Sequence, residues 1–258
     1  MSHVPASPPS VESPLHGRIV VITRPAGTGS SMARQVRRRG GVPLLLPGLA
    51  LRGADDAAGA AEALRAALDD DVLVFTSPAA ARFAARLAPL RTDAVVLAVG
   101  LGTARVLRRL GVHEPLAPES RQDSEGLLAH PALAQLHGKR VTLVGAPGGR
   151  GVLGEALAMR AARLHELHVY RRAPPRWQRR QLDAVRALPV DARVLLSSAE
   201  ALDNLRTGLP ADAFAALRRT VAVASSERLA QAARAAGFEH IALAASAVGE
   251  DMLAAAAR

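Results

Sequence analysis

Short apolar runs alternate with longer segments rich in Ala, Leu and Arg along most of this 258-residue chain. Such uninterrupted runs indicate strands buried on both faces, and their alternation with helical segments is typical of parallel α/β units. The predicted strands are Ile19–Thr23, Pro43–Leu46, Val72–Thr76, Val95–Val99, Val141–Val144, Leu164–Val169, Val194–Ser197, Val221–Ala224 and His240–Ala244. The predicted helices cover about 31–39, 57–68, 78–87, 103–110, 124–129, 152–162, 177–188, 199–205, 227–236 and 248–256.

This order of elements occurs twice. Gly17–Pro25 is matched by Gly138–Ala146, an offset of 138 − 17 = 121, and Val72–Ser77 is matched by Arg193–Ser198 at the same offset, 193 − 72 = 121. Solenoids and propellers have repeats of roughly 20 to 50 residues, so a repeat this long indicates a duplicated domain. We predict two similar lobes with a cleft between them, each lobe a doubly wound parallel sheet flanked by helices.

Several loops that follow predicted strands are small, hydroxylated or rich in glycine. In a doubly wound sheet these loops lie where ligands bind against the free amide groups of helix N-termini, which fits an anion held by amides and hydroxyls. A second interpretation stays open, because Ser and Thr after a strand commonly cap the next helix and glycines permit tight turns. The candidate residues are Arg24, Thr76, Ser77, Gly102, Thr103, Gly149, Arg150, Ser197, Ser198 and Ser226.

Familiar nucleotide and metal motifs are incomplete. The segment Gly27–Gly29 begins like a dinucleotide fingerprint, but Met32 stands where the third glycine belongs, and the loop Gly145–Gly151 lacks the Lys-Ser/Thr of a P-loop. His165 and His168 are three residues apart in a predicted strand, which places them on opposite faces. The chain has no cysteine, which excludes disulfides and thiolate chemistry. We therefore expect no nucleotide and no metal.

The net charge of +10 favours a polyanionic partner, such as nucleic acid, an acidic membrane or a substrate with many carboxylates. No basic run is longer than Arg37–Arg39, and this run contains no aromatic residue for stacking on bases, so a nucleic acid is not expected. No run approaches the roughly 18 to 20 apolar residues of a membrane helix. Residues 1–14 are rich in Pro and Ser and are predicted to form a disordered tail, neither signal peptide nor anchor. A cytoplasmic protein is the expectation.

Taken together, five motifs resemble the uroporphyrinogen-III synthase family in order and spacing, over a region from about Gly17 to the C-terminus. The matching pieces are Val21–Gly27, Val74–Ala80, Ala98–Ala104, Asp123–Leu128 and Glu166–Arg172. The resemblance implies that the lobes are not the two sequence halves. One lobe would consist of 15–46 and 174–258 and the other of 53–165, with linker strands at 47–52 and 166–173 that pair as a two-stranded ladder.

The activity that the resemblance implies is the cofactor-independent closure of linear hydroxymethylbilane. Water is lost, ring D is inverted, and uroporphyrinogen III is formed for haem biosynthesis. Because this substrate carries eight carboxylates, it would suit a site lined with amides and hydroxyls. The resemblance implies a monomer without cofactor or membrane partner, with a possible transient contact to the preceding pathway enzyme.

By the same resemblance, Tyr170 matches a tyrosine that relatives place near the substrate, where its phenol would donate a proton to the departing hydroxyl or hold the substrate. Thr103 and Ser197 match positions near the substrate in relatives. Arg24, Thr76, Ser77, Ser124 and Arg150 are candidates for binding propionate or acetate groups. The chain departs from the pattern at Leu229, where many relatives have a threonine.

A non-catalytic module with two lobes that binds an anion, or senses one, is the alternative. Two similar lobes with a cleft are equally typical of such proteins. The two hypotheses differ at Tyr170, since its replacement by Phe would slow an enzyme severely and leave a simple binder nearly unchanged.

Overall fold

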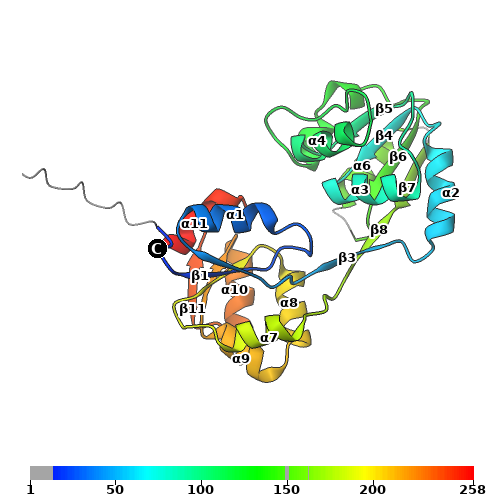
Figure 1. Cartoon of the computed structure of the whole chain (residues 1–258). Helices are drawn as coiled ribbons and strands as arrows, with labels where there is room; N and C mark the ends of the chain where they lie inside the picture. The colour runs from blue at the N-terminus through cyan, green and yellow to red at the C-terminus, as the bar shows by residue number, and fades with distance from the viewer. Residues whose placement is uncertain (1–13, 149–150, 162) are drawn as a thin grey trace, which may run out of the picture. The chain divides into compact units, whose positions relative to one another are not determined.

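The computed structural model describes residues 14–148, 151–161 and 163–258, which form two compact units (Figure 1). Unit 1 contains the described residues up to Ala50 together with Ala173–Arg258, and unit 2 contains those of Leu51–Arg172. Most of the predicted tail, as well as Gly149 and Arg150 among the predicted site residues, lies outside the described residues.

Unit 1 is built on a sheet whose described strands are all parallel. Their order is β11-β10-β9-β1-β2, in which β1 lies between β2 and β9. Numbered by their order along the chain within the unit, the strands run 2-1-3-4-5, as in flavodoxin-like doubly wound folds. The strands are β1 (Ile19–Ile22), β2 (Val42–Leu45), β9 (Arg193–Leu196), β10 (Val221–Ala224) and β11 (His240–Leu243).

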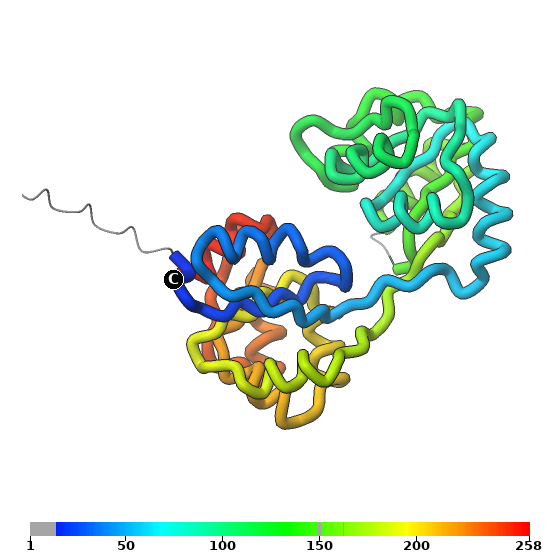
Figure 2. Tube along the Cα trace, in the orientation of Figure 1, coloured from blue at the N-terminus to red at the C-terminus, as the bar shows by residue number. Residues whose placement is uncertain are grey.

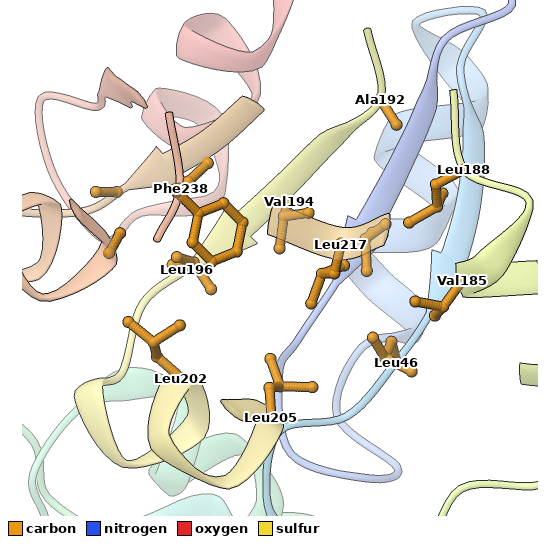
Figure 3. Packing of buried hydrophobic residues seen from close by; sticks show 14 of the residues in the cluster. Leu46, Val185, Leu188, Ala192, Val194, Leu196, Leu202, Leu205, Leu217 and Phe238 are labelled. Carbon is orange, nitrogen blue, oxygen red and sulfur yellow. The ribbon is translucent and has the colours of Figure 1, made fainter. Parts of the chain in front are cut away.

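Helices cover both faces of this sheet because alternate residues of each strand point to opposite sides. Val20 and Ile22 pack against α1 (Ser30–Arg38) and α11 (Gly249–Ala257). Val21 faces the opposite way and belongs to the cluster that Figure 3 shows. The helices packed on that second face are α7 (Arg179–Arg186), α8 (Ala199–Gly208), α9 (Ala211–Arg218) and α10 (Glu227–Ala235).

Helix α9 is missing from the helices predicted from sequence. Proline typically ends a helix, and Pro210 follows the last residue of α8 by two positions. It is nevertheless the N-cap residue of α9, a position that does not require its missing N–H. The helix buries Ala213 and Leu217 and is tied to α7 by a hydrogen bond from Arg186 to Asp212. This hydrogen bond lowers the pKa of the Asp212 carboxyl below its usual value.

Two arginines hold the C-terminal end of α11 in unit 1. Arg193 is only 7% exposed and donates from Nε to the Ala256 carbonyl at 3.1 Å. Arg18 donates from Nη1 to the carbonyls of Ala256 and Ala257, each at 3.2 Å. Burial lowers the pKa of the Arg193 guanidinium, while the carbonyls that face it lie at the negative end of the helix dipole. The buried charge is therefore paired with backbone oxygens.

Replacing Arg193 with Met is expected to lower the free energy of unfolding by about 1–3 kcal/mol, because its hydrogen bonds to the Ala256 and Asp191 carbonyls are lost while the apolar stem is kept. Urea unfolding measures the change. Arg180→Met is the control, since it removes an exposed charge from α7 and should change stability by less than about 0.5 kcal/mol. Equal effects of the two variants would contradict this account of α11.

Unit 2 has a smaller parallel sheet of the same winding, with the strand order β5-β4-β6-β7. One face packs against α2, α3 and α4, and the other against α5, α6 and a short 3₁₀ helix, η1. The strands are β4 (Val72–Phe75), β5 (Val95–Ala98), β6 (Arg140–Gly145) and β7 (Arg163–His168). The helices are α2 (Ala57–Ala67), α3 (Pro78–Leu87), α4 (Leu101–Arg109), α5 (Ser124–Leu128), η1 (Pro131–Leu133) and α6 (Gly151–Arg160).

The chain passes from unit 1 to unit 2 along β3 (Ala50–Gly53) and returns along β8 (Tyr170–Ala173), as Figure 2 shows. These strands pair with each other as a separate two-stranded sheet. The predicted fold class is therefore confirmed: both units contain a doubly wound parallel sheet flanked by helices, and a two-stranded ladder connects them.

The strands of the ladder are shorter than the segments predicted for it. On the outgoing side, β3 begins at Ala50, because the preceding residues are bonded within unit 1: Gly48 N–H donates to the Thr23 carbonyl at 2.9 Å, and Trp177 donates to the Pro47 carbonyl at 2.9 Å. On the return side, residues 166–168 belong to β7 and pair with β6. The chain then leaves that sheet at Val169 and continues as β8.

Candidate active site

A pocket of about 440 Å³ lies in unit 2 at the carboxyl ends of β4 and β6. These adjacent strands are followed by helices that pack on opposite faces of the sheet, α3 on one and α6 on the other. The strand order reverses at this point, which is where ligands bind in doubly wound sheets. Of the predicted site residues that the structure describes, four line the pocket: Thr76, Ser77, Ser124 and Tyr170.

The ends of β4 and β6 approach closely because β6 ends on a glycine. A Cβ atom on Gly145 would lie 2.7 Å from the hydroxyl oxygen of Thr76, closer than real side chains come. That hydroxyl donates to the Val144 carbonyl at 3.2 Å. The small residue thus leaves space for the pocket above the paired strand ends.

Ser77 caps α3, as its position after a strand suggested, and it also lines the pocket. It is the N-cap of α3, accepting the Ala80 N–H at 3.0 Å, and Pro78 follows as the first helical residue. Its hydroxyl oxygen also lies 3.2 Å from that of Tyr170. A capping role therefore does not exclude a place in the site.

Tyr170 is the first residue of β8 and is 9% exposed. Its ring stacks on Phe83 of α3, with centroids 5.4 Å apart, and the Arg86 guanidinium lies over the Phe83 ring. The tyrosine ring is thus fixed by packing, while the hydroxyl lies at the pocket beside Ser77. A phenol held in this way can donate one hydrogen bond, or a proton, to a bound group.

Charged side chains line the pocket as well, and sequence reasoning missed them. Glu166 and His168 alternate with the buried Leu167 and Val169, and Arg172 follows four residues after His168. Glu166 Oε2 and His168 Nε2 are 3.6 Å apart. Arg172 Nη2 donates to the carbonyls of Pro147 and Gly148 at 3.3 and 3.0 Å. The signal that could have found them is their spacing of two and four residues from Tyr170, because strand residues two apart share a face.

At the pocket rim, α5 begins next to Asp123. The Asp123 carboxylate accepts the Gly126 N–H at 2.9 Å and pairs with Arg121 at 2.8 Å. Ser124, the first residue of this helix, lines the pocket beside it. Asp123 is therefore held by the turn that it caps.

Two predicted residues of unit 2 lie outside the described lining of this pocket. Both belong to α4: Gly102 is exposed and Thr103 is buried, 4% exposed. Thr103 lies on the side of α4 that faces the core, with Ala104 and Leu107.

The remaining predicted residues belong to unit 1, at the carboxyl ends of its strands. Arg24 donates to the Ala247 carbonyl at 3.2 Å. Ser198 and Ser226 cap α8 and α10, accepting N–H groups at 3.3 and 3.4 Å, and Ser197 precedes the first of these caps. Leu229, which replaces the threonine of many relatives, is 5% exposed and packs in the core of this unit.

His165 and His168 line different pockets, as their predicted orientation requires. The pocket beside His165 is formed with α2, through Ala63 and Ala66. In the part of the chain that the structure describes, no three His, Asp or Glu residues are grouped so that they could hold a metal ion. Within the same residues, no helix is both long enough and apolar enough to cross a membrane.

Comparison with known proteins gives one consistent family. A family model described as uroporphyrinogen-III synthase HemD matches residues 30–254. The uroporphyrinogen-III synthase of Escherichia coli K12 is 28% identical over 207 residues, which are 74% of this chain and 80% of that protein. That of Salmonella typhimurium LT2 is 29% identical over 160 residues, 59% of this chain and 64% of the relative.

Solved structures agree on the fold. A mutant uroporphyrinogen III synthase from the extremely thermophilic bacterium Thermus thermophilus aligns with a TM-score of 0.54 at 22% identity, covering 92% of this chain and 96% of the other. The uroporphyrinogen-III synthetase of Helicobacter pylori 26695 aligns with a TM-score of 0.57 at 13% identity, covering 92% and 97%.

Proposed function

Since this chain belongs to the uroporphyrinogen-III synthase family, we propose that it closes linear hydroxymethylbilane to uroporphyrinogen III with the unit 2 pocket as part of its substrate site. The observation that carries this placement is the pair of hydroxyls of Ser77 and Tyr170, 3.2 Å apart at the point where the sheet reverses its strand order. Tyr170 is the proposed catalytic residue.

The reaction needs a proton and protection from water. Protonation of the terminal hydroxyl releases water and leaves an electrophilic azafulvene, which a ring carbon attacks to give a spiro intermediate. Fragmentation and reclosure then yield the inverted ring. Because the substrate closes unaided to the type I isomer, the protein must hold its ends in the geometry for inversion and keep water from the cation. A phenol fixed by stacking on Phe83 suits the first step, either as the proton donor or as a hydrogen-bond donor to the terminal hydroxyl.

The other predicted residues complete the proposal as contacts for the substrate carboxylates. In the pocket these are Thr76, Ser77 and Ser124, which supply hydroxyls beside helix N-termini. The further proposed contacts are Arg24, Gly102, Thr103, Gly149, Arg150, Ser197, Ser198 and Ser226. The positive net charge supports a polycarboxylate as the substrate class.

We further propose a cytoplasmic monomer that needs no cofactor and meets the preceding pathway enzyme only transiently. The reaction supports the lack of a cofactor, because one molecule is dehydrated and rearranged with no redox change and no group carrier. Size-exclusion chromatography with light scattering tests the monomer.

The decisive experiment generates hydroxymethylbilane in situ, adds the protein, oxidises the products and separates the porphyrin isomers by chromatography. We expect the type III isomer to predominate. If the type I isomer forms at the uncatalysed rate, the enzymatic function is wrong for this chain, and the anion-binding module becomes the better account.

A further inference from the structure

Strand β7 presents two further ionisable side chains, Glu166 and His168, to the pocket. Leu167 and Val169 are buried, 4% and 1% exposed, and belong to the core on the α3 face. Glu166 and His168 alternate with them and line the pocket, with side chains 54% and 45% exposed. These two side chains thus share a face of β7, close to the pocket that also holds the Tyr170 hydroxyl.

Among the described residues lining the pocket, four side chains besides Tyr170 carry an ionisable group. Arg172 offers only N–H donors and donates to the carbonyls of Pro147 and Gly148. Asp123 caps α5 and pairs with Arg121. Glu166 and His168 contact each other, at 3.6 Å, so this pair is the one equipped to exchange a proton with a ligand.

We propose that His168, paired with Glu166, is a catalytic acid and base in the ring closure, a role that rests on the proposed function. An imidazolium is a stronger acid than a phenol by roughly a thousandfold, and histidine is the residue most often used for such transfers. The ion pair with Glu166 forms when the imidazole carries its second proton, which is the state required to protonate a leaving group.

Within one turnover, His168 gives up one proton and takes one back. The His168 imidazolium gives its proton to the terminal hydroxyl, the carbon–oxygen bond breaks, and water leaves. After inversion and reclosure, the pyrrole carbon that formed the new bond loses its hydrogen as a proton, which neutral His168 accepts. The net change is the loss of one water. In this scheme Tyr170 orients the terminal hydroxyl of the substrate by a hydrogen bond.

Gly154 of α6 lies against the Glu166 carboxylate. A Cβ atom on Gly154 would lie 2.7 Å from Glu166 Oε1, so the glycine lets the helix pass close to the carboxylate. Glycine is a poor residue inside a helix, and its presence here is explained by this approach. Gly154→Ala would push the carboxylate away from its place without weakening the helix.

The test compares His168→Gln, Glu166→Gln and Gly154→Ala with a matched control, His165→Gln, in the isomer assay under steady-state conditions. His165 lies on the same strand but faces the pocket near α2. We expect His168→Gln to lower kcat about 100-fold with KM within about twofold of wild type, and His165→Gln to leave both unchanged. Glu166→Gln and Gly154→Ala should lower kcat less, with unchanged helical content by circular dichroism.

Added imidazole should restore part of kcat to His168→Ala, because it can occupy the space and carry the proton. The proposal is overturned if His168→Gln keeps the wild-type kcat, or if its loss lies in KM alone. Both results differ from failure of the proposed function, in which the wild-type protein itself yields no excess of the type III isomer.

Discussion

Tyr170→Phe is expected to lower kcat for the type III isomer by about 100-fold while the protein stays folded. The ring that stacks on Phe83 at 5.4 Å is retained, and only the hydroxyl next to Ser77 is lost. That hydroxyl is the group proposed to hold the terminal hydroxyl of the substrate, so its loss should affect the rate more than binding. Steady-state kinetics with isomer analysis measures both quantities.

Ser77→Ala tests two contributions of the Ser77 hydroxyl, as the N-cap of α3 and as a group in the pocket. It should cost about 1 kcal/mol of stability as a lost N-cap and, in addition, lower the yield of the type III isomer, since the serine hydroxyl contacts Tyr170. Asp56→Ala is the matched control, because Asp56 caps α2 in the same unit, accepting the Gly59 N–H at 2.8 Å, and does not line the described pocket.

A Tyr170→Phe protein with wild-type kinetics would contradict the proposed catalytic role of Tyr170 and favour the binding module.

Phe75→Ala is expected to lower the free energy of unfolding of unit 2 by about 3–5 kcal/mol. Phe75 is the last residue of β4, is 1% exposed, and packs in the core between the sheet and α3. Leu196 stands at the equivalent place in the repeat, 196 − 75 = 121, and is fully buried in unit 1. Leu196→Ala should lower the stability of unit 1 by about 2–5 kcal/mol.

Hydrogen exchange followed by mass spectrometry checks both variants, because peptides from each unit report their own protection. The core clusters of the two units share no described residue, so each variant should raise exchange in its own unit. Met159→Ala, at a side chain that is 83% exposed, serves as the control with little effect. A uniform rise in exchange over both units after Phe75→Ala would contradict independent cores.

The fold class could be predicted from sequence because strands buried on both faces are continuous apolar runs. Val72–Phe75 and Val221–Ala224 are such runs, and both lie inside parallel sheets. The limits of the ladder were harder to predict. Pro47 and Gly48 lie in an extended apolar stretch, and their hydrogen bonds to residues of unit 1 come from segments far away in the sequence.

The candidate site was predictable in part. Ser77 stands out because it follows a strand, and Tyr170 because of the family resemblance, but their contact joins residues 93 positions apart. Glu166 and His168 could be reached from the sequence only through their spacing from Tyr170, because a strand with many polar residues does not by itself show which polar face lines a pocket. Only the burial of Leu167 and Val169 on the other side makes that face evident.

The two copies of the internal repeat do not coincide with the two units of the structure. By the offset of 121, β1 is equivalent to β6 and β4 to β9. In the sheets, however, β1 pairs with β9 and β4 with β6. Each unit therefore combines the first part of one copy with the second part of the other.

This exchange of parts fixes the order in which the units can be completed during synthesis. Unit 2 is continuous, so all of its strands have been made once the ribosome has passed Arg172. Strand β1 belongs between β2 and β9, and β9 is made only after that point. The first apolar strands of the nascent chain must therefore wait, without their neighbour β9, until the last third of the protein emerges, and during this interval they expose the unpaired strand edges that make nascent chains prone to aggregate.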